Sequence, residues 1–268
     1  MEYQNFDCEI ADGAARIQLI GPGAPLLSDL CDEILDLCLR LQEDRAVRAL
    51  LFTDGDHAFE FHHDLADLAQ AHLQNEGVER LAADEDIGRK IVTILADFPK
   101  PVVAATRGDI RNLGLGFYMA ADLRLASPEA TFTAADLTGG LLPGWGLTHI
   151  LPRLIGPGRT LDFLWTRRTL GAQEALRIGL VDRLIPVEEW DQELQTTLDR
   201  LCSLPQPAVR LMKLAVQQAG NLDLTTMLAL EWEAQQQCWF SRETSEGLLA
   251  WQEGRRPELD RLDPDNED

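Results

Sequence analysis

The sequence predicts an α/β fold, with a core in which strands and helices alternate and a C-terminal extension made of helices. Short apolar runs bounded by Gly, Pro or Asp alternate with helical segments as far as about residue 185. Beyond that point the pattern is helical almost throughout. At 268 residues the chain is long enough to bury one substantial core.

The chain begins with the pattern of a β-hairpin followed by a helix. Polar and apolar residues alternate over 6–10 and 15–20, and Asp12-Gly13 between them favours a tight turn. The next apolar residues share one face of a predicted helix, namely Leu30, Ile34, Leu37 and Leu41.

The following elements are predicted from short apolar runs and their terminators. The predicted strands are residues 48–53, 102–106, 122–126, 130–133 and 181–185. A helix over 87–98 ends before Pro99, and a second helix lies around 113–121.

Composition excludes several classes of function. A net charge of −21 disfavours binding to nucleic acids and to anionic membrane surfaces. No apolar run approaches the roughly 20 residues that span a bilayer, and no secretory signal precedes the first strand. The five cysteines are scattered and form no C-x-x-C pair, which favours reduced thiols in the cytoplasm and no metal site.

A series of motifs over nearly the whole chain resembles the crotonase, or enoyl-CoA hydratase/isomerase, superfamily. In chain order they are Arg48–Phe59, Pro99–Gly108, Ala121–Ala126, Ala130–Phe132, Leu142–Gly146, Leu151–Gly156, Ala172–Val181, Ser241–Leu248 and Arg255–Pro257. The resemblance is to a divergent member, because several positions in the active-site motifs differ.

The resemblance implies a crotonase-like spiral of β-β-α turns in residues 1–200. Residues 201–268 would form a helical trimerisation region with an acidic tail. It also implies a homotrimer or homohexamer that acts on an acyl-CoA thioester. Coenzyme A would be present only as part of the substrate, with no permanently bound cofactor.

Two backbone N–H groups polarise the thioester carbonyl in this family and stabilise the enolate formed from it. The resemblance places the first donor at His63, within Phe59–Leu65, and the second at Leu113. His62 stands where the family has a glycine, and Asn112-Leu-Gly114 stands where it has three. Leu113 would open a helix, where free N–H groups and the helix dipole favour negative charge.

Hydration of an enoyl thioester uses two carboxylates, one as base and one as acid. A gap-free alignment with the family puts Gly116 at the first position and Asp136 at the second. We therefore expect weak or altered hydratase activity, and we expect Gly116→Glu to raise it. A single carboxylate could still move a proton between carbons, as family isomerases do. The alternative is that Asp136 only caps the turn before Gly139.

His62 is the second candidate catalytic residue, because it lies beside the predicted hole and could supply the missing base. In the alternative, His62 faces solvent and His63 contributes only its N–H.

The resemblance also suggests contacts with coenzyme A. The segment Gly21–Ser28 resembles the loop that holds the adenine end, with contacts at Ala24 and Leu26. The other expected contacts are with His63, Asp64, Leu65 and Arg255. Arg255 resembles a basic residue near the CoA phosphates, although it could equally pair with surface carboxylates.

The leading hypothesis is thus an acyl-CoA lyase or isomerase. Two alternatives stay open on the same fold. One is a hydrolase that cleaves a carbon–carbon bond in a β-diketone without CoA, using the histidines with Asp136. The other is a trimeric scaffold that has lost catalysis, as the changes at His62, Leu113 and Gly116 would allow.

Overall fold

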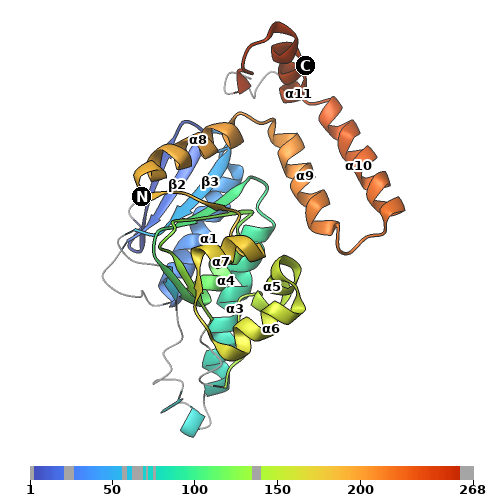
Figure 1. Ribbon diagram of the computed structural model, residues 1–268. Coiled ribbons are helices and arrows are strands. Elements are labelled where there is room, and N and C mark those ends of the chain that lie inside the picture. The colour runs from blue at the N-terminus through green and yellow to red at the C-terminus, as the bar shows by residue number, and fades with distance from the viewer. Residues whose placement is uncertain are drawn as a thin grey trace.

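The computed structural model describes residues 3–20, 27–55, 59–61, 69–70, 72–74, 77–134 and 140–259. In these residues the strands form two sheets, and the last helices extend away from the core (Figure 1). The larger sheet has the order β1 (Phe6–Ala11), β2 (Ala14–Leu19), β3 (Ala49–Thr53), β5 (Val102–Thr106), β7 (Leu123–Ala126) and β10 (Arg183–Leu184). The smaller has the order β4 (Glu60–Phe61), β6 (Asp109–Asn112), β8 (Thr131–Thr133) and β9 (Leu170–Gly171).

The helices lie between and after these strands. They are α1 (Leu27–Glu43), α3 (Gly77–Ala96), α4 (Leu113–Met119), α5 (Leu147–Ile155), α6 (Pro157–Thr166), α7 (Ala172–Ile178), α8 (Trp190–Cys202), α9 (Gln206–Gln218), α10 (Leu224–Trp239) and α11 (Arg242–Glu253), with a 3-10 turn at Val187–Glu189. The predicted α/β core and helical C-terminal extension are confirmed.

The first two strands form the predicted hairpin. They pair antiparallel in a register that runs from Phe6 opposite Leu19 to Ala11 opposite Ala14. Asp12 and Gly13 both have positive φ, at 50° and 80°. Positive φ at both central residues is the requirement of the two-residue turn that suits twisted strands.

Alternate residues of the central strands face opposite sides of the larger sheet. Leu50 and Phe52 of β3 lie in the main core with α1, α3 and α4, whereas Ala49 and Leu51 pack toward α8. The predicted apolar face of α1 is buried in the main core.

One helix is longer than predicted, and three short strands were not predicted. The helix expected over 87–98 begins ten residues earlier, at Gly77. Residues 77–86 are mostly small or charged, so they lack the apolar periodicity that marks a helix. Strands β4, β6 and β9 were not predicted, because each has only two to four residues and depends on a partner strand.

Asp54 fixes the turn that connects β5 to β6. Its Oδ2 accepts hydrogen bonds from Thr106 Oγ1 at 2.6 Å and from the backbone N–H groups of Arg107 and Gly108 at 2.8 and 2.9 Å. Its Oδ1 is buried and has no hydrogen-bond partner among the described residues. Burial raises the pKa of Asp54, although the three hydrogen bonds oppose the shift. Asp54 thus joins the end of β3 to the start of the strand that leads to Leu113.

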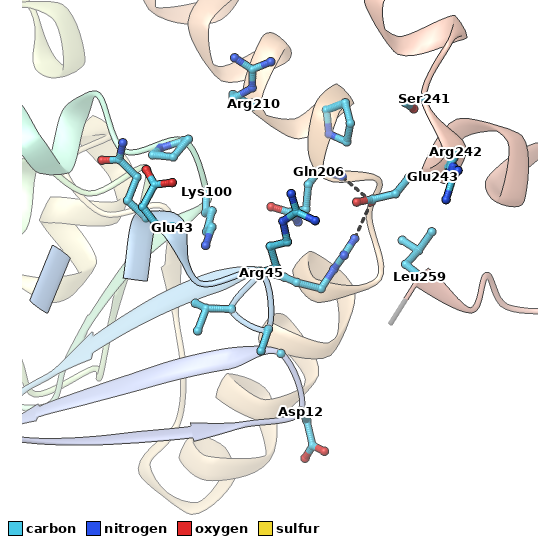
Figure 2. Close-up of a pocket in the computed structure, with 17 residues that line it drawn as sticks. Asp12, Glu43, Arg45, Lys100, Gln206, Arg210, Ser241, Arg242, Glu243 and Leu259 are labelled. Carbon is cyan, nitrogen blue, oxygen red and sulfur yellow. Dashed lines mark hydrogen bonds and ion pairs between the residues drawn. The ribbon is translucent and has the colours of Figure 1, made fainter. Parts of the chain in front are cut away.

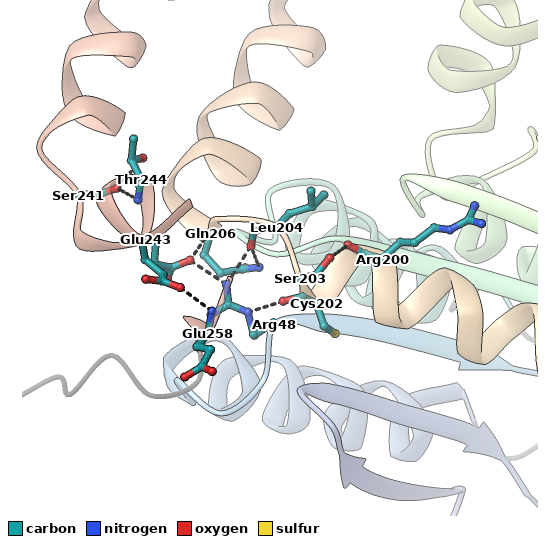
Figure 3. A network of polar contacts seen from close by, with 11 residues as sticks. Arg48, Arg200, Cys202, Ser203, Leu204, Gln206, Ser241, Glu243, Thr244 and Glu258 are labelled. Atoms are coloured by element: carbon teal, nitrogen blue, oxygen red, sulfur yellow. Dashed lines mark hydrogen bonds and ion pairs between the residues drawn. The ribbon is translucent and has the colours of Figure 1, made fainter. Parts of the chain in front are cut away.

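Arg48 connects the core to the C-terminal helices (Figure 3). Its guanidinium donates to the carbonyl oxygens of Cys202 and Leu204 at 2.7 and 2.8 Å. It also pairs with Glu243 of α11 at 2.7 Å, and the same carboxylate oxygen accepts from the N–H of Gln206 at 2.8 Å. The arginine side chain is only 7% exposed, so these bonds replace water almost completely.

A second connection holds α9 against the core. Lys213 pairs with Asp122 at 2.8 Å, and the same oxygen accepts from the N–H of Val102 at 2.8 Å. Gln217, one turn later, donates to the carbonyl of Ala96 at the end of α3, at 2.7 Å. The boundary predicted at residue 200 therefore lies within the end of α8, and the helices beyond it are bound to the core at two places.

Replacing Arg48 should destabilise the protein strongly. Arg48→Met leaves Glu243 without its buried partner, so we expect a loss of about 3 to 5 kcal/mol in the free energy of unfolding, measured by urea denaturation. The matched control is Arg89→Met, because Arg89 is 68% exposed in its pair with Asp86. That change should cost no more than about 1 kcal/mol. Equal, small losses in both variants would contradict the assigned role of Arg48.

Asp54→Asn should alter how stability depends on pH. A carboxyl with a raised folded-state pKa contributes stability that is fully present below its unfolded pKa, and that is lost as the pH rises through the folded value. Wild type should therefore gain stability relative to Asp54→Asn as the pH falls from about 7 to about 4.5, in urea unfolding series at each pH. A difference that stays constant over this range would show that Asp54 ionises as in the unfolded chain.

Candidate functional site

Two of the predicted site residues, Leu113 and Arg255, lie in the described part of the chain. The others lie outside it, namely Ala24, Leu26, His62, His63, Asp64, Leu65 and Asp136. The geometry of the candidate site is therefore built from the elements that lead into these segments.

The parallel pair of β4 and β6 directs both predicted donor segments to one edge. Glu60 is opposite Arg111, and Phe61 is opposite Asn112. His63 follows Phe61 by two residues, and Leu113 follows Asn112 directly. Neighbouring strands lie about 4.8 Å apart, and the carboxyl ends of parallel strands share one edge of the sheet. This pairing, which the sequence did not predict, supports the convergence of the two segments.

Gly114 allows the first turn of α4 to lie against the backbone of Phe59. A Cβ atom added at Gly114 would overlap the carbonyl oxygen of Phe59, so no larger residue fits there. Leu113, one residue earlier, has its side chain buried in the main core and its N–H at the start of the helix. The close contact fixes the position of that N–H relative to β4.

Asn112 keeps a glycine-like backbone at the position before the predicted donor. Its φ is 53° and its ψ is −124°, a combination that L residues rarely adopt. Such strain costs on the order of 1 to 3 kcal/mol and persists only where the surroundings enforce it. Its Oδ1 is also buried without a hydrogen-bond partner in the described residues. Asn112 therefore adopts a backbone conformation here that a glycine adopts with less strain.

The space beside Gly116 is occupied by Trp145. A Cβ atom added at Gly116 would overlap the Cβ of Trp145 and lie 2.9 Å from its carbonyl oxygen. A Cβ atom added at Gly88 of α3 would overlap the indole ring of the same residue. Trp145 is 3% exposed and has a φ of 56°. A glutamate at position 116 would therefore overlap Trp145, and this packing opposes the prediction that Gly116→Glu raises hydratase activity, which no measurement yet tests.

The sequence analysis did not predict that Trp145 fills the space beside Gly116. The motif Gly144-Trp145-Gly146 showed an unusual aromatic residue between glycines, but the spacing could not reveal its neighbours. An isolated glycine within a predicted helix, such as Gly88, often has a packing reason and was the available signal.

Arg255 is engaged by carboxylates of its own region. Its guanidinium pairs with Glu246 of α11, and its Nε donates to Glu253 at 2.6 Å. The hydrogen bond from Arg255, followed by one from the N–H of Glu258, lowers the pKa of Glu246 to about 2. The structure shows the surface ion pair that was the alternative for Arg255, and its contact with CoA phosphates stays a prediction.

A cavity of about 940 Å³ lies elsewhere, between the core and the C-terminal helices (Figure 2). Its lining includes Arg48 and Lys100, which precede β3 and β5, so it opens at the amino ends of these strands. The predicted donors instead follow the carboxyl ends of β4 and β6. Arg48 uses its Nε and Nη2 in structural bonds, and Lys100 donates to the carbonyl of Asp44 at 2.7 Å. The cavity therefore lies away from the predicted donors, and its size is not evidence that it is the active site.

Among the residues with assigned positions, no cluster of side chains could hold a metal ion. No helix in the same residues is long and apolar enough to cross a membrane.

Comparison with known proteins identifies the family. The family model described as enoyl-CoA hydratase/isomerase matches residues 9–261. The crotonyl-CoA hydratase of Syntrophomonas wolfei is 32% identical over 259 residues, covering 96% of this chain and 98% of that protein. The human mitochondrial enoyl-CoA hydratase domain-containing protein 2 is 34% identical over 234 residues, covering 85% of this chain and 78% of that protein.

Solved structures agree with the sequence comparison. The crystal structure of enoyl-CoA hydratase from Bacillus anthracis has a TM-score of 0.86 and 29% identity, and it covers 95% of this chain and 98% of that one. The enoyl-CoA hydratase/isomerase from Cupriavidus metallidurans has a TM-score of 0.84 and 25% identity, covering 96% of each chain. The predicted crotonase-like fold is confirmed. The chain therefore belongs to the enoyl-CoA hydratase/isomerase family.

Proposed function

We propose that this protein moves a proton between carbons of an acyl-CoA thioester, through an enolate held by the N–H groups of His63 and Leu113. The observation that carries the proposal is the filled space beside Gly116, which leaves no place for the first of two hydratase carboxylates. The paired strands β4 and β6 support the two-donor hole, because they lead to both donors from one edge.

In this mechanism Asp136 is the single acid/base group. Its carboxylate takes a proton from the carbon next to the thioester carbonyl, and the electron pair moves to the carbonyl oxygen, where the two N–H groups stabilise it. Asp136 then returns the proton at the far end of a neighbouring double bond, which shifts that double bond. No water is added, so a second carboxylate is not needed. His62 is the alternative base.

The names of relatives point to hydration instead of isomerisation. Crotonyl-CoA hydratase and short-chain-enoyl-CoA hydratase are names given to proteins similar to this chain. Hydration and the proposed isomerisation both begin with a thioester carbonyl in an oxyanion hole, so they share one class of substrate. The choice between hydration and isomerisation depends on whether a carboxylate stands at position 116, and the packing of Trp145 there favours isomerisation.

We also propose a homotrimer or homohexamer. The C-terminal helices expose many large apolar side chains, among them Met212, Val216, Leu228, Trp232, Trp239, Phe240 and Trp251. Apolar surface of this extent is typical of an interaction site. A second copy of the chain is the occupant that the family resemblance suggests.

Binding of thioesters tests the substrate class. Crotonyl-CoA or acetoacetyl-CoA at about 100 times its Kd should stabilise the protein by about 2.7 kcal/mol, measured by thermal shift with free CoA for comparison. The absence of a shift with every thioester would contradict an acyl-CoA function.

Asp136→Asn tests the acid/base role. The variant should still bind thioesters, but it should isomerise a 3-enoyl-CoA about 10² to 10⁴ times more slowly, because proton transfer loses its carrier. Asp7→Asn is the control, since Asp7 is exposed on β1. Equal rates in wild type and Asp136→Asn would remove Asp136 from the mechanism.

Gly116→Glu tests the assignment of the filled space. Overpacking against Trp145 and burial of a carboxylate should lower stability by at least about 3 kcal/mol without a gain in hydration. Gly158→Glu is the matched control, because a Cβ atom at Gly158 of α6 meets nothing within 4 Å.

The double variant Gly116→Glu with Trp145→Gly completes this test. Glycine removes the overlapping Cβ and accepts the positive φ, which leaves only the backbone oxygen of residue 145 to shift, so hydration of crotonyl-CoA should appear only in this variant. A stable Gly116→Glu single variant with raised hydratase activity would disprove the assignment.

A further inference from the structure

The cavity of about 940 Å³ at the amino ends of β3 and β5 has a basic wall in an acidic protein. The chain carries a net charge of −21, whereas five basic and three acidic side chains line this cavity, an excess of two positive charges. The basic residues are Arg45, Arg48, Lys100, Arg210 and Arg242, and the acidic residues are Asp12, Glu43 and Glu243. A local reversal of sign of this kind attracts small anions.

Arg45 lines the cavity with a guanidinium that is unpaired in the described part of the chain. It forms no hydrogen bond or ion pair with the described residues, so its five N–H donors are free to bind a ligand. Its side chain points from the core toward the start of α9, where Gln206 lies (Figure 2).

The loop that carries Arg45 is held in place by its neighbours. The Oδ1 of Asp44 accepts a hydrogen bond from the N–H of Ala46 at 2.9 Å, and the carbonyl oxygen of Asp44 accepts one from Lys100 at 2.7 Å. Arg45 therefore starts from an ordered backbone, which lowers the entropic cost of binding.

Arg48 and Lys100 add donors from buried positions. The Nη1 of Arg48 forms no bond with the described residues. Lys100 is 9% exposed, and within the described residues its ammonium donates only to the carbonyl oxygens of Leu41 and Asp44, so one of its three donors remains. Burial lowers the pKa of Lys100, although Asp44 and Glu43 oppose the shift. An anion in the cavity would compensate this buried charge.

Two helices begin at the other side of the cavity. α9 starts at Gln206 and α11 starts at Arg242, and both residues line the cavity. The positive end of each helix dipole favours negative charge there. The N–H of Gln206 already donates to Glu243, so the helices contribute to the potential and the basic side chains supply the bonds.

We propose that this cavity binds the phosphate group of a small molecule, held by Arg45, the Nη1 of Arg48 and Lys100. A phosphate monoester carries nearly two negative charges at pH 7, which matches the excess of two positive charges in the wall. Guanidinium groups also match the geometry of phosphate oxygens. The volume is typical of sites for small molecules, so an organic group has room beside the phosphate.

The proposed phosphate site is separate from the proposed acyl-CoA site, because the predicted N–H donors follow the carboxyl ends of β4 and β6. A ligand bound in the cavity would join the loop before β3 to the starts of α9 and α11. Occupancy should therefore stabilise the attachment of the C-terminal helices to the core.

The test is the binding of pyrophosphate to the full chain, measured by calorimetry at constant ionic strength. Wild type should bind pyrophosphate, and Arg45→Gln should bind it at least about tenfold more weakly, because a charge-assisted contact is lost. Since Arg45 has no partner in the described residues, Arg45→Gln should unfold at the same temperature as wild type.

The matched control is Arg177→Gln, which removes the same charge from a side chain on α7 that is 75% exposed and lies outside the cavity. Its affinity for pyrophosphate should equal that of wild type. A second arm repeats the wild-type titration with saturating crotonyl-CoA, which should leave the affinity unchanged.

No binding of pyrophosphate by wild type, or equal affinities in wild type and Arg45→Gln, would overturn the proposed phosphate site. Displacement of pyrophosphate by crotonyl-CoA would also overturn it, because the binding would then belong to the acyl-CoA site. These results leave the proposed acyl-CoA function untouched, since the binding of thioesters tests that function separately.

Discussion

The contact between Gly114 and the backbone of Phe59 is the constraint on which the rest of the candidate site depends. It lets α4 begin directly beside β4, so that the Leu113 N–H lies near the chain that enters His62 and His63. Asn112, directly before Leu113, has a strained backbone with a φ of 53°. A larger residue at position 114 would separate the two segments, whatever their side chains.

The packing of Trp145 is the feature behind the proposal that this member of the family isomerises its substrate. The fold is that of the family, and strand pairing and a glycine contact position the segment that begins at Leu113, the proposed second donor. The acid/base residues are side chains, and the space for a side chain at position 116 is filled by the Cβ and backbone of Trp145, from another part of the chain. Membership of the family therefore supports an acyl-CoA substrate. It gives weaker support to any one fate of the enolate, because that depends on individual side chains.

Two buried basic residues bind the C-terminal helices to the core. Arg48 and Lys213 are used within the protein, where they bind the C-terminal helices to the core through Glu243 and Asp122. Burial raises the pKa of Asp122 and lowers that of Lys213, so the low dielectric opposes the charges that the pair requires. These connections position the helices whose exposed apolar side chains would form the subunit interface.

The sequence by itself determined the α/β class, the hairpin, the buried strands β3 and β5 and the family, because these depend on local periodicity and on ordered motifs. It also predicted an N–H donor at Leu113, and it shows a glycine, not a carboxylate, at position 116. Only the tertiary structure decided what occupies that space, since Gly88, Gly116 and Trp145 are far apart in the chain and meet only when α3, α4 and the start of α5 pack together. Short strands such as β4 and β6 likewise exist only because they pair with each other.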